Sequence, residues 1–139
     1  LIDGIRGATN FRLGGWQGYQ DTDFEAIVDL GSFKNLSLVG AGFLQDARSW
    51  IWMPIYVEFS VSADGINFTT VGKILNKVPE EDENPQVQTL VLKSDKFIAP
   101  ATGVRFIKVF AKNLGTIPAW HPGAGEPAYI FIDEILADY

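Results

Sequence analysis

The chain has 139 residues, 47% of them hydrophobic and 20% charged, which suits one globular domain with a buried core and excludes a disordered segment. It contains no cysteine and one histidine, so disulfides, a thiolate nucleophile and a multi-histidine metal centre are excluded. The formal net charge of −6, without a visible basic cluster, argues against nucleic acid and anionic lipid surfaces as partners.

The chain opens at Leu1 without a signal peptide, and we interpret it as a piece of a longer protein. Residues 3–23 are rich in glycine, which predicts loop and turn rather than a regular element. Two apolar segments follow at residues 24–30 and 36–44, and both are predicted to be strands.

The clearest periodic pattern lies at residues 55–61, where every second side chain is apolar. Such alternation predicts a half-buried strand. Asp64 and Gly65 follow, and an Asp-Gly pair supplies the positive φ of a tight turn. Residues 67–74 are therefore predicted to return as the second strand of a hairpin.

The second half of the chain contains two unusual connections. Residues 80–85 form an acidic run that ends in proline, which is typical of a solvated and mobile loop. Residues 113–127 form a longer connection that carries Trp120 and the only histidine, His121, and long connections of this kind are often functional. The remaining predicted strands are residues 87–92, 104–111 and 129–136.

Short strands separated by glycine and proline, with no stretch of convincing helical periodicity, predict an all-β domain. We expect an antiparallel β-sandwich. No internal repeat or linker is visible, so residues 1–139 are expected to form a single domain.

Six short motifs in this order resemble the discoidin-like domains, also called coagulation factor V/VIII type C domains, whose bacterial sugar-binding members are the family-32 carbohydrate-binding modules. The motifs are LIDG (1–4), WQGY (16–19), AIVDLG (26–31), SADGINF (62–68), GVRFIKV (103–109) and FIDEI (131–135). Residues 4–7 and 118–125 resemble more narrowly the domain appended to hexosaminidases, or putative chitobiases, of Bacteroides-type bacteria.

The resemblance implies a galactose-binding-domain-like jelly roll of about eight strands, with a ligand site in the loops at one end. It also implies a C-terminal module of a larger glycosidase. The sequence departs from the family in one respect, because the family has a strand before the Asp-Gly loop and this chain begins almost at that loop.

The resemblance further implies that Asp3 and Glu134 meet at one structural Ca²⁺, helped by loop carbonyls. A hard cation of this kind takes six to eight oxygen ligands, and a glycine-rich loop can supply several carbonyls. An alternative remains open, in which Asp3 accepts hydrogen bonds from its own turn and Glu134 is a surface carboxylate or the partner of Arg6.

A sugar site needs an aromatic platform and a few polar groups at the edge of the ring. The candidates for ligand contact are His121, Trp120, Arg48, Trp50 and Gln45. The expected ligand is a glycan that ends in galactose, N-acetylgalactosamine or N-acetylglucosamine. The glycine-rich opening is expected at the same end of the sandwich as these residues.

Structural roles are the alternative for several of these side chains. Trp16 is expected to be a buried core residue beneath the first loop, and Trp52 could pack against the sheet. His121 could shape its own loop through a hydrogen bond between ring and carbonyl. Arg105 is expected to be a structural strand arginine that pairs with a carboxylate.

Catalysis by this domain is not expected. Asp133 and Glu134 are neighbours, and on a regular strand they would point to opposite faces. No nucleophile motif and no phosphate-binding glycine loop are present in the sequence. The predicted function is therefore a non-catalytic carbohydrate-binding module.

The module is expected to hold a parent glycoside hydrolase of the β-N-acetylhexosaminidase or chitobiase type on its glycan, in the periplasm or at the cell surface. Its other partner would be that catalytic domain, in cis. The alternative function is a domain that binds no glycan and packs against a neighbouring domain.

Overall fold

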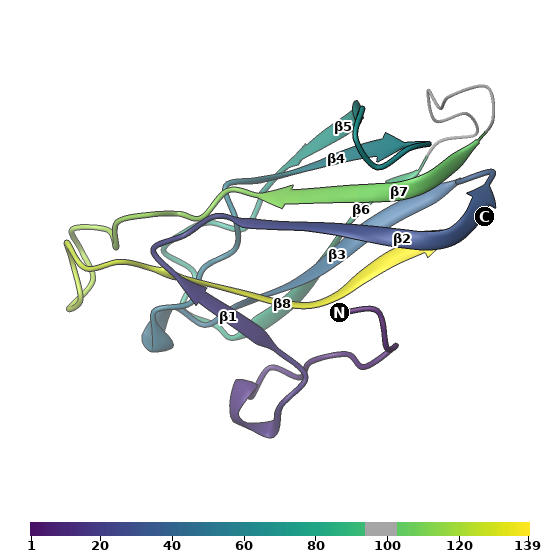
Figure 1. Ribbon diagram of the computed structural model, residues 1–139. Helices are drawn as coiled ribbons and strands as arrows, with labels where there is room; N and C mark the ends of the chain where they lie inside the picture. Colours follow the sequence, from purple (N-terminus) through teal and green to yellow (C-terminus); the bar gives the residue numbers. More distant parts are fainter. Residues whose placement is uncertain (94–102) are drawn as a thin grey trace.

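The computed structural model describes residues 1–93 and 103–139 (Figure 1). Within these residues, eight strands form two antiparallel four-stranded sheets. The strands are β1 (Gln17–Gln20), β2 (Phe24–Lys34), β3 (Leu38–Gln45), β4 (Tyr56–Ser62), β5 (Thr69–Leu75), β6 (Gln86–Lys93), β7 (Val104–Ala111) and β8 (Tyr129–Asp138). The predicted all-β antiparallel sandwich is confirmed.

The first sheet has the strand order β1-β8-β3-β6, and the second has the order β2-β7-β4-β5. Alternate side chains from the facing strands fill the space between them, as period-2 strands require. The most deeply buried core residues include Val39, Ala41, Phe43, Val57, Phe59, Val61, Ile107, Val109, Ile130 and Ile132. Among the described residues, no helix has the length and apolar character needed to cross a membrane.

The β4–β5 hairpin forms as its sequence predicts. The carboxylate of Asp64 accepts hydrogen bonds from the backbone N–H groups of Ile66 (2.9 Å) and Asn67 (2.8 Å), and Gly65 has φ of +76°. A positive φ suits glycine because it has no Cβ. These bonds, with that of Asn67 as the largest cause, hold the pKa of Asp64 well below its usual value.

One strand lies where the sequence predicts only loop and turn. β1 occupies Gln17–Gln20 and pairs with β8 through its whole length. All four of its residues are exposed, so it carries no alternation of buried and exposed side chains. Without that alternation, the periodicity argument has nothing to detect.

A β-bulge interrupts the pairing of β3 with β8. Ala41 lies opposite Ile135, whereas Phe43 lies opposite Ile132. Two residues of β8, Asp133 and Glu134, therefore face the single residue Gly42. A bulge of this kind redirects side chains, so the regular-strand expectation of opposite faces does not apply to this acidic pair.

Candidate functional site

The long loop of residues 113–128 meets the short 3₁₀ helix η2 (Ala47–Ser49) at one end of the sandwich (Figure 1). His121 is buried between them. The N–H of Gly123 donates to its Nδ1 (2.9 Å), so the proton resides on Nε2, which donates to the carbonyl of Ala47 (2.8 Å). Both ring nitrogens are thus used inside the protein, as in the loop-shaping alternative.

The aromatic rings of Trp120 and His121 contact each other at this end. The two rings meet edge to face with 5.4 Å between centroids. Trp120 is 42% exposed, whereas Trp52 is buried and also packs edge to face with the imidazole, with 5.2 Å between centroids. One indole is therefore available to a ligand and the other belongs to the interior.

Trp50 adopts an unusual backbone conformation. Its φ is +67°, in the left-handed region that bulky residues rarely occupy. Hydrogen bonds hold it there, from its own N–H to Ala47 (3.1 Å) and from Tyr129 to its carbonyl (2.8 Å). Its half-buried indole lies against Gly123, where a Cβ would come within 2.8 Å of the ring. Backbone strain of this sort is concentrated at functional sites.

Arg48 lies in η2, between Ala47 and Trp50, and is exposed. Within the described part of the chain, no acidic side chain forms an ion pair with it. The structure therefore brings Arg48, Trp50, Trp120 and His121 to one end of the sandwich.

Gln45 differs from the other candidates because its amide is fully enclosed. Its Nε2 donates to the carbonyls of Pro79 (2.9 Å) and Asp82 (3.0 Å), and its Oε1 accepts from Met53 (3.3 Å). Both polar atoms of the side chain are therefore used inside the protein, and Nε2 fastens the segment of residues 79–82. The sequence contains no signal of this role, because the partners are backbone carbonyls distant along the chain.

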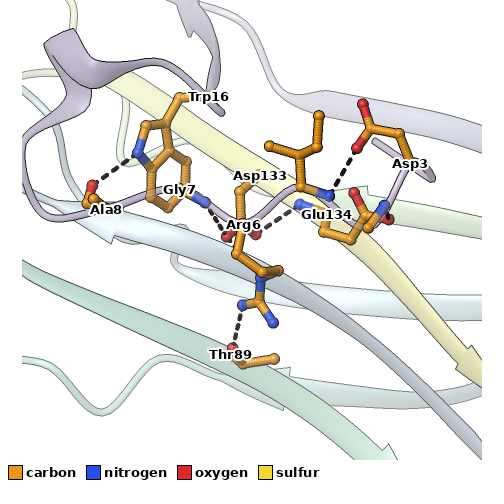
Figure 2. A network of polar contacts seen from close by, with 10 residues as sticks. Asp3, Arg6, Gly7, Ala8, Trp16, Thr89, Asp133 and Glu134 are labelled. Carbon is orange, nitrogen blue, oxygen red and sulfur yellow. Dashed lines mark hydrogen bonds and ion pairs between the residues drawn. The ribbon is translucent and has the colours of Figure 1, made fainter.

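Residues 1–16, which precede β1 and which we call the opening segment, are fastened to the bulge of β8 (Figure 2). Arg6 Nε lies 2.9 Å from Asp133 Oδ2, and its Nη2 donates to Thr89 (2.7 Å). The N–H of Gly7 donates to the same Asp133 oxygen (3.0 Å). Arg6 therefore pairs with Asp133, and the alternative in which Arg6 pairs with Glu134 is wrong.

Asp3 and Glu134 lie beside each other at the start of this segment (Figure 2). The N–H of Gly4 donates to Glu134 Oε1 (2.9 Å), and that of Ile5 donates to Asp3 Oδ1 (3.0 Å). The bond from Ile5 is the largest cause that lowers the pKa of Asp3. Asp3 therefore does form the turn contact of the alternative reading, but Glu134 is buried rather than on the surface.

One oxygen of this pair fits a bound cation. Glu134 Oε2 is buried and has no hydrogen-bond partner among the described residues. An unpaired buried carboxylate oxygen next to a second carboxylate is costly unless a cation neutralises both. Among residues 1–93 and 103–139, no group of three or more acidic or histidine side chains could hold a metal. Further ligands would have to be carbonyl or water oxygens.

The opening segment does not lie where the sequence argument expects it. It covers the outer face of the first sheet along β8, through Asp133 and through the edge-to-face contact of Phe11 with Phe131 (5.4 Å). The last residues of the glycine-rich stretch 3–23 do reach the loop of Trp120. Gln20 donates to the carbonyl of Pro127 (3.1 Å), the N–H of Asp21 donates to that of Ala128 (3.2 Å), and Asn113 Nδ2 donates to that of Thr22 (3.0 Å). The expected proximity therefore holds for residues 20–23. The residues before β1, such as Arg6 and Phe11, lie instead against β8, apart from the end that carries Trp50 and Trp120, which we call the aromatic end.

Trp16 and Arg105 have structural contacts. Trp16 is half-buried, and its Nε1 donates to the carbonyl of Ala8 (2.9 Å). Arg105 forms a bidentate ion pair with Asp29 on the neighbouring strand, with Nε 2.9 Å from Oδ1 and Nη2 3.0 Å from Oδ2. Its predicted pairing with a carboxylate is confirmed.

No protein-family model and no curated protein sequence matches the chain. The structure is similar to that of CBM32-1 from a family 31 glycoside hydrolase of Clostridium perfringens, with a TM-score of 0.57 and 16% identity over 99% of this chain and 81% of that chain. The K2 cleaved adhesin domain of Lys-gingipain matches with a TM-score of 0.45 and 9% identity, over 91% of this chain and 89% of that chain. At these identities the first likeness shows a shared fold.

Proposed function

We propose that this domain is a non-catalytic carbohydrate-binding module whose sugar site is the sandwich end formed by Arg48, Trp50 and Trp120. One observation carries the proposal. An exposed indole, a second indole held at a strained backbone angle and an exposed guanidinium gather there.

The chemistry of these groups suits a sugar ring. The C–H face of a pyranose stacks on an indole, while a guanidinium donates several hydrogen bonds to hydroxyls at the ring edge. Contact with one or two sugar rings leaves little free energy after the ordering of ligand and side chains, so affinity is expected to be weak. Attachment to a catalytic domain that binds the same glycan would compensate through effective concentration.

In this proposal neither His121 nor Gln45 contacts the sugar. His121 ties the loop of Trp120 to η2 through Ala47, and Gln45 fastens residues 79–82. His121 therefore positions the site rather than contacts the sugar, and the amide of Gln45 is fully enclosed and out of reach of a ligand.

The finer assignments rest on the resemblance of the sequence. They are a terminal galactose, N-acetylgalactosamine or N-acetylglucosamine as ligand, a hexosaminidase or chitobiase type of parent enzyme, and a periplasmic or cell-surface location. The compared Clostridium protein is a CBM32 of a glycoside hydrolase, which is consistent with a module of this class.

A glycan array with purified domain tests the proposal. Trp120→Ala is expected to weaken binding to the best glycan at least about tenfold, the loss of about 1.4 kcal/mol of stacking. Phe33→Ala is the matched control, because Phe33 is another exposed aromatic residue and lies outside the aromatic end. Equal binding by wild type and Trp120→Ala would contradict the site.

We also propose that Asp3 and Glu134 hold a structural Ca²⁺, with the unpaired Glu134 Oε2 as the supporting observation. Bound calcium would neutralise the two carboxylates and fasten the opening segment to β8. With calcium at about 100 times its dissociation constant, the gain of about 2.7 kcal/mol should raise the melting temperature by roughly 5–10 °C.

EDTA should remove this gain, and Glu134→Gln should abolish it. A melting temperature that calcium leaves unchanged in the wild type would contradict the metal proposal without bearing on the sugar site.

A second candidate function is packing against a neighbouring domain. The observation that favours it is the group of exposed apolar residues on the opening segment, Ile2, Ile5 and Leu13. If the folded wild-type domain binds no glycan on the array, this function becomes the better explanation of the domain.

A further inference from the structure

The two sheets end in four edge strands, and three of them carry features that discourage pairing with another chain. β1 has only four residues. β2 has an irregular register between Asp29 and Lys34. β5 carries Lys73, and its register with β4 shifts at Phe59 and Ser60. Short length, charge and irregularity are the usual protections of a sheet edge.

The fourth edge strand, β6, is the least protected, because its only charged residue is Lys93 at its last position. It runs for eight residues, Gln86–Lys93, and its register with β3 is unbroken from Gln45 to Leu38. Its sequence QVQTLVLK has no proline and no charge before Lys93. No backbone hydrogen bond to another described segment covers its outer edge. A long and regular edge with a single charged residue at its end is a template for strand pairing.

A hollow of about 290 Å³ lies beside this edge, between β5 and β6. Leu75, which is 62% exposed, lines it together with Ile74, Val78, Gln88 and Leu90. A strand added to β6 would cover this hollow with its own side chains, so the edge offers both backbone hydrogen bonds and apolar contact.

The charge pattern around β6 selects an antiparallel copy of the same strand. Residues 80–83, just before β6, are four consecutive carboxylates, and Lys93 ends the strand. In an antiparallel pair, each Lys93 approaches the acidic segment of the other chain, whereas a parallel pair would place the two acidic segments side by side. A two-fold register centred on Thr89 or Leu90 keeps the inward and outward faces matched.

We propose that β6 pairs with β6 of a second copy of this chain, joining the two first sheets into one continuous sheet across a two-fold axis. The interface of one strand pair falls below about 1,200 Å², so the dimer is weak and concentration-dependent. The proposal is independent of the sugar site, which lies at the loop end of the sandwich.

Sedimentation velocity from about 10 µM to about 1 mM protein tests this pairing, because weak dimers dissociate within that range. Gln88→Lys adds a charge to an exposed position of β6 and is expected to weaken the dimer at least about tenfold. Gln17→Lys is the matched control, since it makes the same change on β1, the opposite edge of the same sheet, and should leave the dimer intact.

Amide hydrogen exchange locates the contact. Protection of residues 86–92 that increases with protein concentration supports the pairing. A wild type that stays monomeric throughout the range would overturn it, and so would a dimer that Gln88→Lys leaves unchanged.

Discussion

At the scale of single residues, Gly42 determines how the opening segment attaches to the sheet. A Cβ at this position would lie 2.0 Å from Asp133 Oδ1 and 2.7 Å from an Arg6 nitrogen. The absence of a side chain therefore gives the buried carboxylate its place in the bulge, where it meets Arg6 and the N–H of Gly7.

Gly42→Ala should displace the Asp133 carboxylate and break its ion pair with Arg6. We expect a loss of about 2–4 kcal/mol in the free energy of unfolding, measured by urea denaturation. Gly40→Ala is the control, because it lies on the same strand and its Cβ would meet only tight contacts of 3.1 Å with Leu90 and Val91. A loss for Gly42→Ala no larger than that for Gly40→Ala would contradict this role of Gly42.

Asp64 gives a prediction about acid stability. Its pKa lies well below the usual value when the chain is folded, chiefly because the backbone N–H groups of Asn67 and Ile66 donate to it. The stabilisation is therefore complete above about pH 4, the value of an unfolded Asp, and is lost as the pH falls toward the lowered folded pKa. Asp64→Asn should lower stability at pH 7 and should flatten the decline below pH 4.

Urea midpoints between pH 7 and pH 2 measure this effect. Glu25→Gln is the control, because Glu25 is exposed and, unlike that of Asp64, its carboxylate has no described hydrogen bond. An acid decline that is the same in Asp64→Asn and in the wild type would show that this turn does not carry the effect.

At the scale of elements, two buried side chains hold the segment between β5 and β6 in place through its backbone carbonyls. The carbonyls of Pro79 and Asp82 accept from Gln45, and the carbonyl of Glu80 accepts from the indole of Trp52 (2.9 Å). The first residues of the acidic run are therefore fixed by hydrogen bonds to buried side chains. The charged sequence of the run does not indicate these bonds.

Gln45→Leu should leave these carbonyls without a donor in a buried place. The expected cost is about 1–3 kcal/mol of unfolding free energy. Binding to a glycan should change less than threefold, because the amide of Gln45 is fully enclosed and cannot reach a ligand. Trp120→Ala should show the reverse pattern, with lost binding and nearly unchanged stability. A Gln45→Leu protein of unchanged stability with lost binding would make Gln45 a ligand contact instead.

The elements differ in how well the sequence predicts them. The β4–β5 hairpin follows from alternation and from Asp64-Gly65, because both signals act locally. β1 and the bulge at Asp133 and Glu134 do not, since exposed Gln and Tyr side chains carry no period and a bulge depends on the register between two distant strands. Arg105 was predictable as a strand arginine, whereas the enclosed amide of Gln45 was not.

At the scale of the whole molecule, three features lie at separate places on one sandwich. The loop end carries the aromatic residues, the outer face of the first sheet carries the opening segment with Asp3 and Glu134, and β6 is an edge with which no further described strand pairs. Their separation means that loss of sugar binding, of calcium stabilisation and of self-association can be measured independently in the variants above.

The central claim is that a glycan stacks on Trp120 and Trp50. The four tryptophans give four indole N–H signals in a ¹H–¹⁵N correlation spectrum, and a titration with the best glycan from the array observes each of them. We predict that the signals of Trp120 and Trp50 shift, while those of Trp16 and Trp52, whose Nε1 atoms donate to Ala8 and Glu80, stay in place. A glycan that binds without moving Trp120 or Trp50 would contradict the account.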